Sequence, residues 1–333
     1  MPWNTPSTPF APLFAAKKRN LGARPVRIAI TGAGGFLGAP LVRLLAARGD
    51  AVAAIVRPGT TQDRLPDLAG AMRIIEGDLD TIGALEAPLA DFRPDVLVHA
   101  AWAGVGAQDR DRPGQLRNVV AAGELAALAG RLGASTFIGI GSQAEYGPVS
   151  GRTDEAVPAR PVTLYGIAKL SAALATQRIC AQAGLRWAWL RVFSLFGPRD
   201  NPQCLIPALI EQIGRGQRPQ LTACTQRWDY LYVEDAAAAV AAVARTPSAA
   251  GLFNLGSGRA PPLLETVIHL RDLLDPTVPL GVGEIPYGPN PVMHLEADIG
   301  RLTALTGWRP TLTLGDGLRA TIAWHRNLVS RTP

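Results

Sequence analysis

A glycine-rich turn between an apolar run and an amphipathic stretch constrains the fold more than any other feature of the sequence. The run Val26–Ile30 is short and rich in β-branched residues, which is typical of a buried parallel strand. The segment Thr31–Gly38 follows it, and Gly38–Arg48 then has leucines at helical spacing. Glycine lets the backbone turn tightly and approach a ligand, and a helix N-terminus attracts anions. Glycines alone also suit a purely structural turn, but this strand–turn–helix order favours binding of a dinucleotide pyrophosphate. The residues expected to form this site are Gly32, Gly35, Phe36, Leu37 and Gly38.

Short apolar runs alternate with helical patterns over the first two thirds of the chain. Helices are expected over Leu116–Leu132 and Tyr165–Ala183. Alternating strands and helices indicate βαβ units, and hence a doubly wound parallel sheet of the Rossmann type in an α/β protein. The expected later strands are Ala51–Val56, Met72–Glu76, Asp95–His99, Ser135–Ile140 and Arg186–Val192.

The pattern changes after about residue 194, where Pro and Gly become frequent and the elements shorten. We therefore expect a dinucleotide-binding domain over 25–193, with 229–258 returning to it. Residues 194–228 and 259–333 are expected to form a smaller, discontinuous substrate-binding lobe, and residues 1–24 an N-terminal extension. The elements expected here are helices over Leu205–Ile213, Asp235–Arg245, Pro262–Leu274 and Leu314–Val329 and a strand over Gly251–Leu255.

Composition excludes several functional classes. The net charge of +6 is spread along the chain without interleaved aromatic residues, so no nucleic-acid partner is expected. No apolar run reaches the length of a membrane span. The cysteines Cys180, Cys204 and Cys224 form no CxxC pair, so neither a metal site nor a disulfide framework is expected, and a reducing cytoplasm fits.

Tyr165 and Lys169 are four residues apart, so both side chains lie on one face of a helix. A tyrosine phenol has an ordinary pKa of about 10. A nearby Lys⁺ and a bound positively charged nicotinamide are expected to lower the Tyr165 pKa, so that the phenol exchanges a proton as a hydride moves. Ser142, just past the expected strand Ser135–Ile140, faces the ligand crevice and is a candidate partner of the reacting oxygen.

The second strand ends without an acidic residue, and Arg57 follows it. An acidic side chain there would bind the adenosine ribose, whereas a guanidinium pairs with a 2′-phosphate. Arg57 therefore favours NADP(H), with NAD(H) as the alternative. Asp78 is a candidate partner of the adenine amino group, and a loop cap is the competing interpretation.

Further motifs follow in order along the chain: His99-Ala100-Ala101, Asn118, residues 191–198, residues 229–235 and residues 253–258. With the glycine turn and the Tyr–Lys pair, they resemble the extended short-chain dehydrogenase/reductase family over about residues 26–328. The likeness is strongest to its sugar-nucleotide epimerases, dehydratases and reductases. The resemblance implies that Tyr165 is the general acid/base, that Lys169 holds the nicotinamide ribose and that Ser142 orients the substrate oxygen. It also implies cofactor contacts from Leu79, Ala100 and Ala101, a nucleotide-sugar substrate, and a homodimer formed through the two long helices. His99 is interpreted as structural.

Departures from the family pattern narrow the reaction. Gln143 and Ala144 stand where the family's 4,6-dehydratases carry Asp and Glu, and Ala144 replaces the Cys of its 3,5-epimerase/reductases. Two reactions remain, namely NADPH-dependent reduction of a 4-keto-6-deoxy sugar and 4-epimerisation with tightly held NAD, and Arg57 favours the first. Trp228 replaces a phosphate-binding Arg of many epimerases, and residues 287–294 lack a second one, which leaves reduction of a non-sugar carbonyl open. A non-catalytic dinucleotide sensor is disfavoured because Tyr165 and Lys169 are both present. The expected substrate-binding residues are Trp102, Gln143, Ser194 and Arg227.

Overall fold

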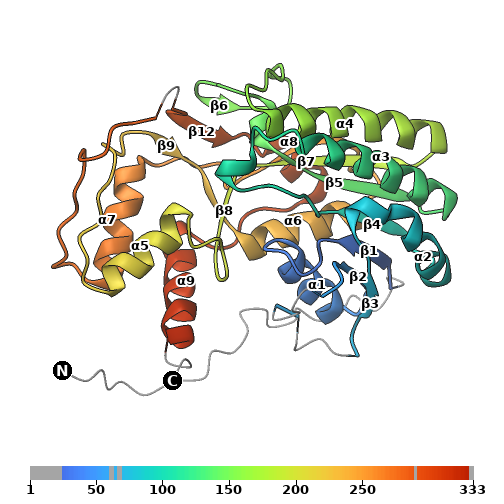
Figure 1. Ribbon diagram of the computed structural model, residues 1–333, viewed down its shortest axis with the longest axis horizontal. Helices are drawn as coiled ribbons and strands as arrows, with labels where there is room; N and C mark the ends of the chain where they lie inside the picture. The colour runs from blue at the N-terminus through green and yellow to red at the C-terminus, as the bar shows by residue number, and fades with distance from the viewer. Residues whose placement is uncertain (1–24, 60–63, 66–69, 289–290, 330–333) are drawn as a thin grey trace.

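A seven-stranded parallel sheet forms the centre of the computed structural model, which describes residues 25–59, 64–65, 70–288 and 291–329 (Figure 1). The expected extension over residues 1–24 lies outside the described residues. The strand order is β11-β7-β5-β4-β1-β2-β3, and every neighbouring pair is parallel. This arrangement confirms the predicted doubly wound α/β fold. The strands are β1 (Arg27–Thr31), β2 (Ala51–Val56), β3 (Arg73–Glu76), β4 (Val96–His99), β5 (Thr136–Ser142), β7 (Arg186–Val192) and β11 (Gly251–Leu255).

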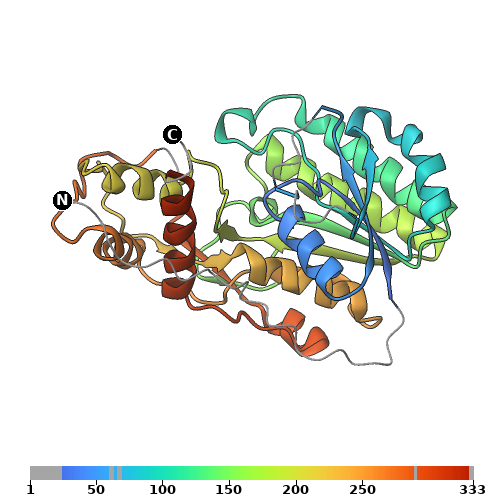
Figure 2. The same cartoon turned by 90° about the horizontal axis from the view of Figure 1, so that it is seen from below.

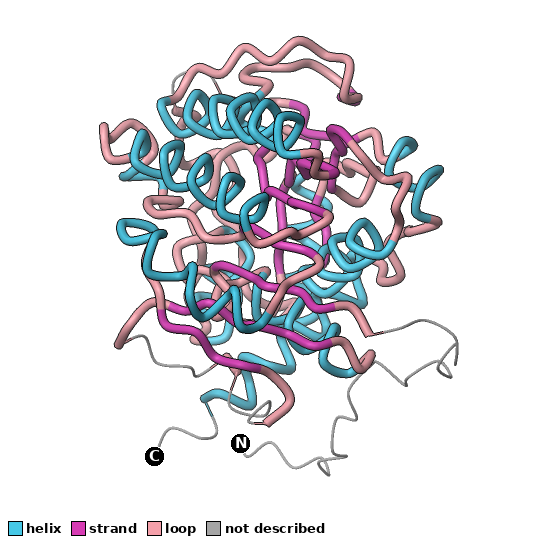
Figure 3. Tube along the Cα trace, turned by 90° about the vertical axis from the view of Figure 1, so that its right-hand side faces the viewer, coloured by secondary structure: helices cyan, strands magenta, loops and turns pink. Residues whose placement is uncertain are grey.

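Helices cover both faces of this sheet (Figures 2 and 3). On one face lie α1 (Gly38–Ala47) and α6 (Val233–Arg245), and on the other α2 (Glu86–Phe92), α3 (Gln115–Arg131) and α4 (Leu164–Ala183). Each face has its own apolar core, because both faces of a parallel sheet must be shielded from water. In the part of the chain that the structure describes, no helix has the length and apolarity to cross a bilayer.

The smaller lobe lies beside the carboxyl ends of the central strands (Figure 1). Its core is formed by α5 (Leu205–Gly214), α7 (Leu263–Leu274) and α9 (Leu314–Val329) around the buried side chains of Leu209, Leu270 and Leu318. Its remaining elements are short, and their lengths of two to four residues give no usable periodicity in the sequence. They are the parallel pair β8 (Ser194–Phe196) and β10 (Tyr230–Tyr232), and the three-stranded sheet of β6 (Arg152–Thr153), β12 (His294–Ala297) and β9 (Arg227–Trp228). The late helix α8 (Gly300–Thr306) packs instead against β11 of the large sheet, with Leu302 in the same core as α1 and α6.

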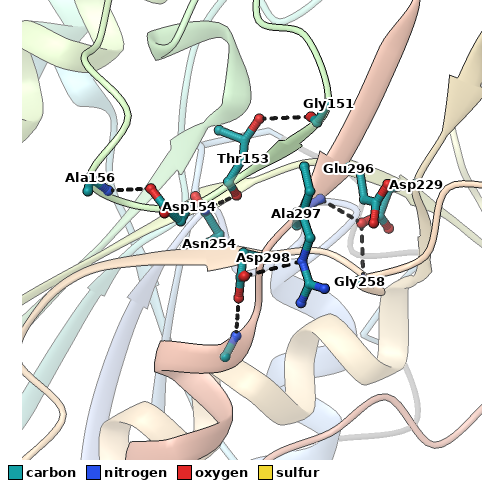
Figure 4. A network of polar contacts seen from close by, with 12 residues as sticks. Gly151, Thr153, Asp154, Ala156, Asp229, Asn254, Gly258, Glu296, Ala297 and Asp298 are labelled. Atoms are coloured by element: carbon teal, nitrogen blue, oxygen red, sulfur yellow. Dashed lines mark hydrogen bonds and ion pairs between the residues drawn. The ribbon is translucent and has the colours of Figure 1, made fainter.

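Buried polar contacts join the small sheet to the large one (Figure 4). Asp229 accepts hydrogen bonds from the backbone N–H groups of Ser257 (2.6 Å), Gly258 (3.1 Å) and Ala297 (3.0 Å). The Asn254 side chain, at β11, donates to the carbonyl of Thr153 in β6 over 2.8 Å. These two side chains satisfy backbone groups that would otherwise be buried without partners.

Most predicted elements differ from the observed ones by one or two residues at their ends. The largest difference concerns the strand expected over Ser135–Ile140, which extends to Ser142 as β5. The extension arises because β5 pairs with β7 throughout, with Gly141 opposite Arg191 and Ser142 opposite Val192. Ser142 is therefore the last residue of a strand rather than a loop residue.

Candidate active site

A cleft of about 1670 Å³ opens at the carboxyl ends of the central strands. Pockets for one small molecule usually occupy about 300–1,000 Å³, so this cleft has room for two ligands side by side. Most of the residues predicted for the site line it: Gly32, Gly35, Phe36, Leu37, Arg57, Asp78, Leu79, Ala100, Ala101, Trp102, Gln143, Ser142, Tyr165, Lys169 and Ser194. Two do not. Gly38 lies beneath the glycine turn, and Arg227 is exposed on β9 outside the lining.

The glycine turn between β1 and α1 has the shape of a cradle for a pyrophosphate. Gly32 has φ +69°, and a Cβ there would lie 2.8 Å from the amide N of Ala101. A Cβ on Gly38 would overlap the carbonyl oxygen of Gly32. The first turn of α1 then presents backbone N–H groups and the positive end of the helix dipole. The turn therefore fits a dinucleotide cofactor.

Gly38→Ala is expected to weaken NAD(P)(H) binding by about tenfold or more, because overpacking of about 1–3 kcal/mol must be relieved by moving the turn. Gly83→Ala is the control, since a Cβ at Gly83 meets nothing within 4 Å and Gly83 lies outside the residues that line the cleft. The measurement is cofactor affinity by calorimetry or by quenching of tryptophan fluorescence. Equal affinities of the two variants would contradict this account of the turn.

Arg57 and Asp78 lie at the end of the cleft where β2 and β3 finish. The Arg57 side chain is exposed and directly follows β2. Asp78 is the N-cap of a 3₁₀ helix, Leu79–Leu85, and accepts a hydrogen bond from the Asp80 N–H at 3.1 Å. The structure thus shows the loop-capping role of Asp78, and the same side chain also borders the cleft.

Helix α4 carries Tyr165 and Lys169, and local packing sets their position. Thr163 caps its N-terminus by accepting a hydrogen bond from Gly166 N–H at 3.1 Å. Gly166 has no side chain, and a Cβ there would overlap the carbonyl oxygen of Ala144. The helix therefore comes close to the end of β5, where the Tyr165 phenol lies near Ser142 and both residues line the cleft. Tyr165 and Lys169 are both buried on the same helix face.

The pKa of the Tyr165 phenol is shifted in the direction opposite to the one expected from the sequence. Burial raises this pKa above the ordinary value, while the nearby Ser142 side chain and the charge of Arg110 act in the opposite direction. The expected lowering by Lys169 is not found, because Lys169 Nζ lies 5.9 Å from the Tyr165 ring centroid and is directed elsewhere. In this state the phenol is held protonated, which suits a proton donor.

Lys169 Nζ donates to the carbonyl oxygen of Ile140 over 2.7 Å and lies 3.6 Å from the Trp102 ring centroid. Burial lowers the pKa of this ammonium, and the nearby Glu145 carboxylate raises it. The indole of Trp102 is fixed by a hydrogen bond from its Nε1 to Gln115 Oε1 (2.8 Å). Trp102 therefore borders the cleft as a rigid aromatic wall that contacts Lys169 by a cation–π interaction.

His99 is buried at the end of β4, with its Nδ1 2.9 Å from Thr31 Oγ1. Burial, with a smaller contribution from Lys169, lowers the pKa of His99 to about 3. The imidazole is therefore neutral and tethered to β1, and it is not among the residues that line the cleft. These contacts agree with the structural interpretation of this residue.

Sequence reasoning missed several cleft residues. Arg64, Arg110 and Arg199 line it, and the Arg110 guanidinium lies 5.4 Å from the Tyr165 ring centroid. Trp228 also lines it and donates from Nε1 to Ser194 Oγ at 2.8 Å, so the predicted residue Ser194 is engaged by the indole. Arg64, Arg110 and Arg199 come from separate loops without a motif, so no spacing in the sequence could indicate them.

Comparisons with known proteins identify a family model, related sequences and similar structures. Residues 28–256 match the family model described as "NAD dependent epimerase/dehydratase family". The chain is 26% identical to UDP-glucose 4-epimerase of Azospirillum brasilense (91% of this chain, 92% of that protein). It is 28% identical to dTDP-6-deoxy-L-talose 4-dehydrogenase (NAD(P)(+)) of Kitasatospora kifunensis (89% and 94%). Its fold matches UDP-N-acetylglucosamine 4-epimerase from Methanobrevibacter ruminantium M1, with a TM-score of 0.84 at 24% identity (92% and 100%). Since the family model spans most of the sequence, the chain belongs to the NAD-dependent epimerase/dehydratase family.

Proposed function

We propose that this enzyme reduces the 4-keto group of a nucleoside-diphosphate 4-keto-6-deoxy sugar with NADPH, and that Tyr165 donates the proton. The observation that carries the proposal is the meeting of Ser142, Tyr165 and Lys169 in one cleft, with Gln143 and Ala144 in place of an elimination acid and base. A relative named for 4-dehydrogenation of dTDP-6-deoxy-L-talose with NAD(P)⁺ supports both the substrate class and the redox chemistry.

Each of these cleft residues has a separate role in the proposed carbonyl reduction. NADPH held by the glycine turn and Lys169 would supply the hydride to the carbonyl carbon. Ser142 holds the carbonyl oxygen by a hydrogen bond, and Tyr165 gives its phenolic proton to that oxygen as the C–O double bond becomes an alcohol. Lys169 holds the nicotinamide ribose and offsets the negative charge left on Tyr165. The wall formed by Trp102 stacks against the sugar and excludes water.

Arg57→Ala is expected to raise the KM for NADPH by about 10- to 100-fold while leaving the KM for NADH nearly unchanged, because a charge-assisted contact is worth about 1.5–3 kcal/mol. Arg57→Lys is the matched control. Its KM for NADPH is expected to lie between those of the wild type and Arg57→Ala, since an ammonium keeps the charge but not the bidentate geometry. Steady-state kinetics with both cofactors measures the effect. A parallel change for NADPH and NADH would remove the basis for a 2′-phosphate contact.

The proposed reaction is tested by following reduced-nicotinamide absorbance with a 4-keto-6-deoxy nucleotide sugar. We expect one NADPH consumed per alcohol formed, faster than with NADH. The second candidate is 4-epimerisation, which the similarity to UDP-glucose 4-epimerase favours. It predicts tightly bound NAD in the purified protein and interconversion of 4-epimers without net consumption of cofactor, which would overturn the reductase proposal.

We also propose a homodimer formed through α3 and α4. Apolar side chains on these helices are exposed in the single chain, among them Leu116, Val120 and Leu174. Association of two copies would cover them, which is the usual reason for such a patch on a folded chain. Analytical ultracentrifugation tests this proposal. The wild-type protein is expected to sediment as a dimer and the Val120→Glu variant as a monomer.

A further inference from the structure

We infer that Glu145 is a positioning residue, which fixes the reacting end of β5 through a buried carboxylate. This inference rests on the proposed function, because it concerns the placement of Ser142 for carbonyl chemistry. Glu145 lies three residues after Ser142, at the end of a one-turn 3₁₀ helix over Gln143–Glu145. It does not line the cleft, but it holds Ser142 by a hydrogen bond, and its charge also raises the pKa of Lys169.

The Glu145 carboxylate is fully buried, and both of its oxygens have partners. Oε1 accepts hydrogen bonds from the Ser142 backbone N–H and from Trp189 Nε1, each at 2.9 Å. Oε2 forms an ion pair with Arg191 Nε at 2.7 Å. Ser142 Oγ in turn accepts from Ala144 N–H at 3.1 Å, so the turn after β5 is held at two points. A hydroxyl held in this way has little freedom, which is what a hydrogen-bond donor to a reacting oxygen requires.

Two glycines of β5, Gly139 and Gly141, leave space for the Glu145 carboxylate and for the indole beside it. A Cβ on Gly141 would lie 2.5 Å from Glu145 Oε1 and would overlap Trp189 Nε1. A Cβ on Gly139 would overlap the six-membered ring of the same indole. The two glycines of β5 therefore create the space that Trp189 and Glu145 occupy. The charged side chain in this space has hydrogen-bond donors for both of its oxygens. A buried carboxylate that is satisfied in this way indicates an arrangement specified by the sequence.

The contacts continue from Arg191 to the smaller lobe. The Arg191 guanidinium lies 4.3 Å from the Tyr146 ring centroid, and Tyr146 Oη donates to Asn254 Oδ1 at 2.7 Å. Asn254 in turn donates to the Thr153 carbonyl, the bond drawn in Figure 4. Glu145 thus connects the strand that carries Ser142 to the junction between the two lobes.

The test uses two double variants that differ only at residue 145. Both remove the ion pair, so neither leaves Arg191 buried without a counter-ion, which would destabilise the fold. Glu145→Gln with Arg191→Met keeps an acceptor oxygen for the Ser142 N–H. Glu145→Met with Arg191→Met replaces the pair by apolar side chains of similar volume. We expect kcat for NADPH-dependent reduction to be about 10²-fold lower in the Met pair than in the Gln pair, with similar KM values for NADPH.

A second readout needs no substrate. Hydrogen exchange of the Ser142 amide is expected to be slow in the Gln pair and fast in the Met pair. The melting temperature is expected to be lower in the Met pair, because Ser142 N–H and Trp189 Nε1–H lose their buried acceptor there. Equal kcat values together with a protected Ser142 amide in both pairs would overturn the inference and assign Glu145 a purely structural role. Failure of the wild-type enzyme to consume NADPH would count against the proposed function, and amide exchange would then decide the role of Glu145 alone.

Discussion

Tyr165→Phe is expected to lower kcat by about 10²- to 10⁴-fold, the range found for loss of a general acid. The substitution removes one oxygen from a buried ring that lies near Ser142. It leaves the ring itself, which packs edge-on against Trp102 with the two ring centroids 6.2 Å apart. Binding of NADPH should change little, because the cradle for the cofactor is formed by the glycine turn and not by the phenol. The measurement is NADPH oxidation with substrate, together with cofactor affinity measured separately.

Tyr287→Phe is the matched control. The Tyr287 hydroxyl is hydrogen bonded by Thr225 N–H at 3.0 Å and lies outside the residues that line the cleft. We expect wild-type kcat for this variant. If Tyr165→Phe kept more than about a tenth of wild-type kcat, a group other than this phenol would have to supply the proton.

Asp229→Ala is expected to lower the free energy of unfolding by about 3–5 kcal/mol. It leaves the N–H groups of Ser257, Gly258 and Ala297 buried without their acceptor, at about 1–3 kcal/mol for each unsatisfied group. Asp229 also joins β9 to β12 and to the loop after β11, so the hydrogen bonds lost in this variant lie at the junction of the lobes (Figure 4). Urea unfolding measures the effect as a lower midpoint at an unchanged m-value.

Two further variants calibrate this result. Asp229→Asn keeps one acceptor oxygen and is expected to be intermediate. Asp91→Ala removes an exposed ion pair with Arg73 and is expected to cost less than about 1 kcal/mol. An Asp229→Ala midpoint equal to that of Asp91→Ala would show that the three N–H groups find water, and the junction would then not depend on this carboxylate.

The sequence predicted the fold and the centre of the site because their signals are local. The run before Gly32, the leucines of α1 and the spacing of Tyr165 and Lys169 each lie within a single element or turn. The structure adds a second reason for the glycine at position 32, because a Cβ there would lie 2.8 Å from the amide N of Ala101. Local patterns of this kind can be read from one chain because neighbouring residues dictate them.

What the sequence did not predict depends on contacts between distant segments. Glu145 and Arg191 are far apart in the chain, so their ion pair follows only from the pairing of β5 with β7. Strand β9 has two residues, and its side chains alternate between faces, which turns Trp228 into the cleft and Arg227 away from it. The pKa of Tyr165 likewise depends on burial by the whole fold.

Transfer of deuterium from labelled NADPH tests the central claim most directly. The enzyme is incubated with a 4-keto-6-deoxy nucleotide sugar and NADPH deuterated at both hydrogens of nicotinamide C4, and the product sugar is analysed by NMR and mass spectrometry. The proposed function predicts one deuterium at C4 of each product molecule, with product formed about 10²- to 10⁴-fold more slowly by Tyr165→Phe. Recovery of unreduced 4-keto sugar, or a product with no deuterium at C4, would contradict it.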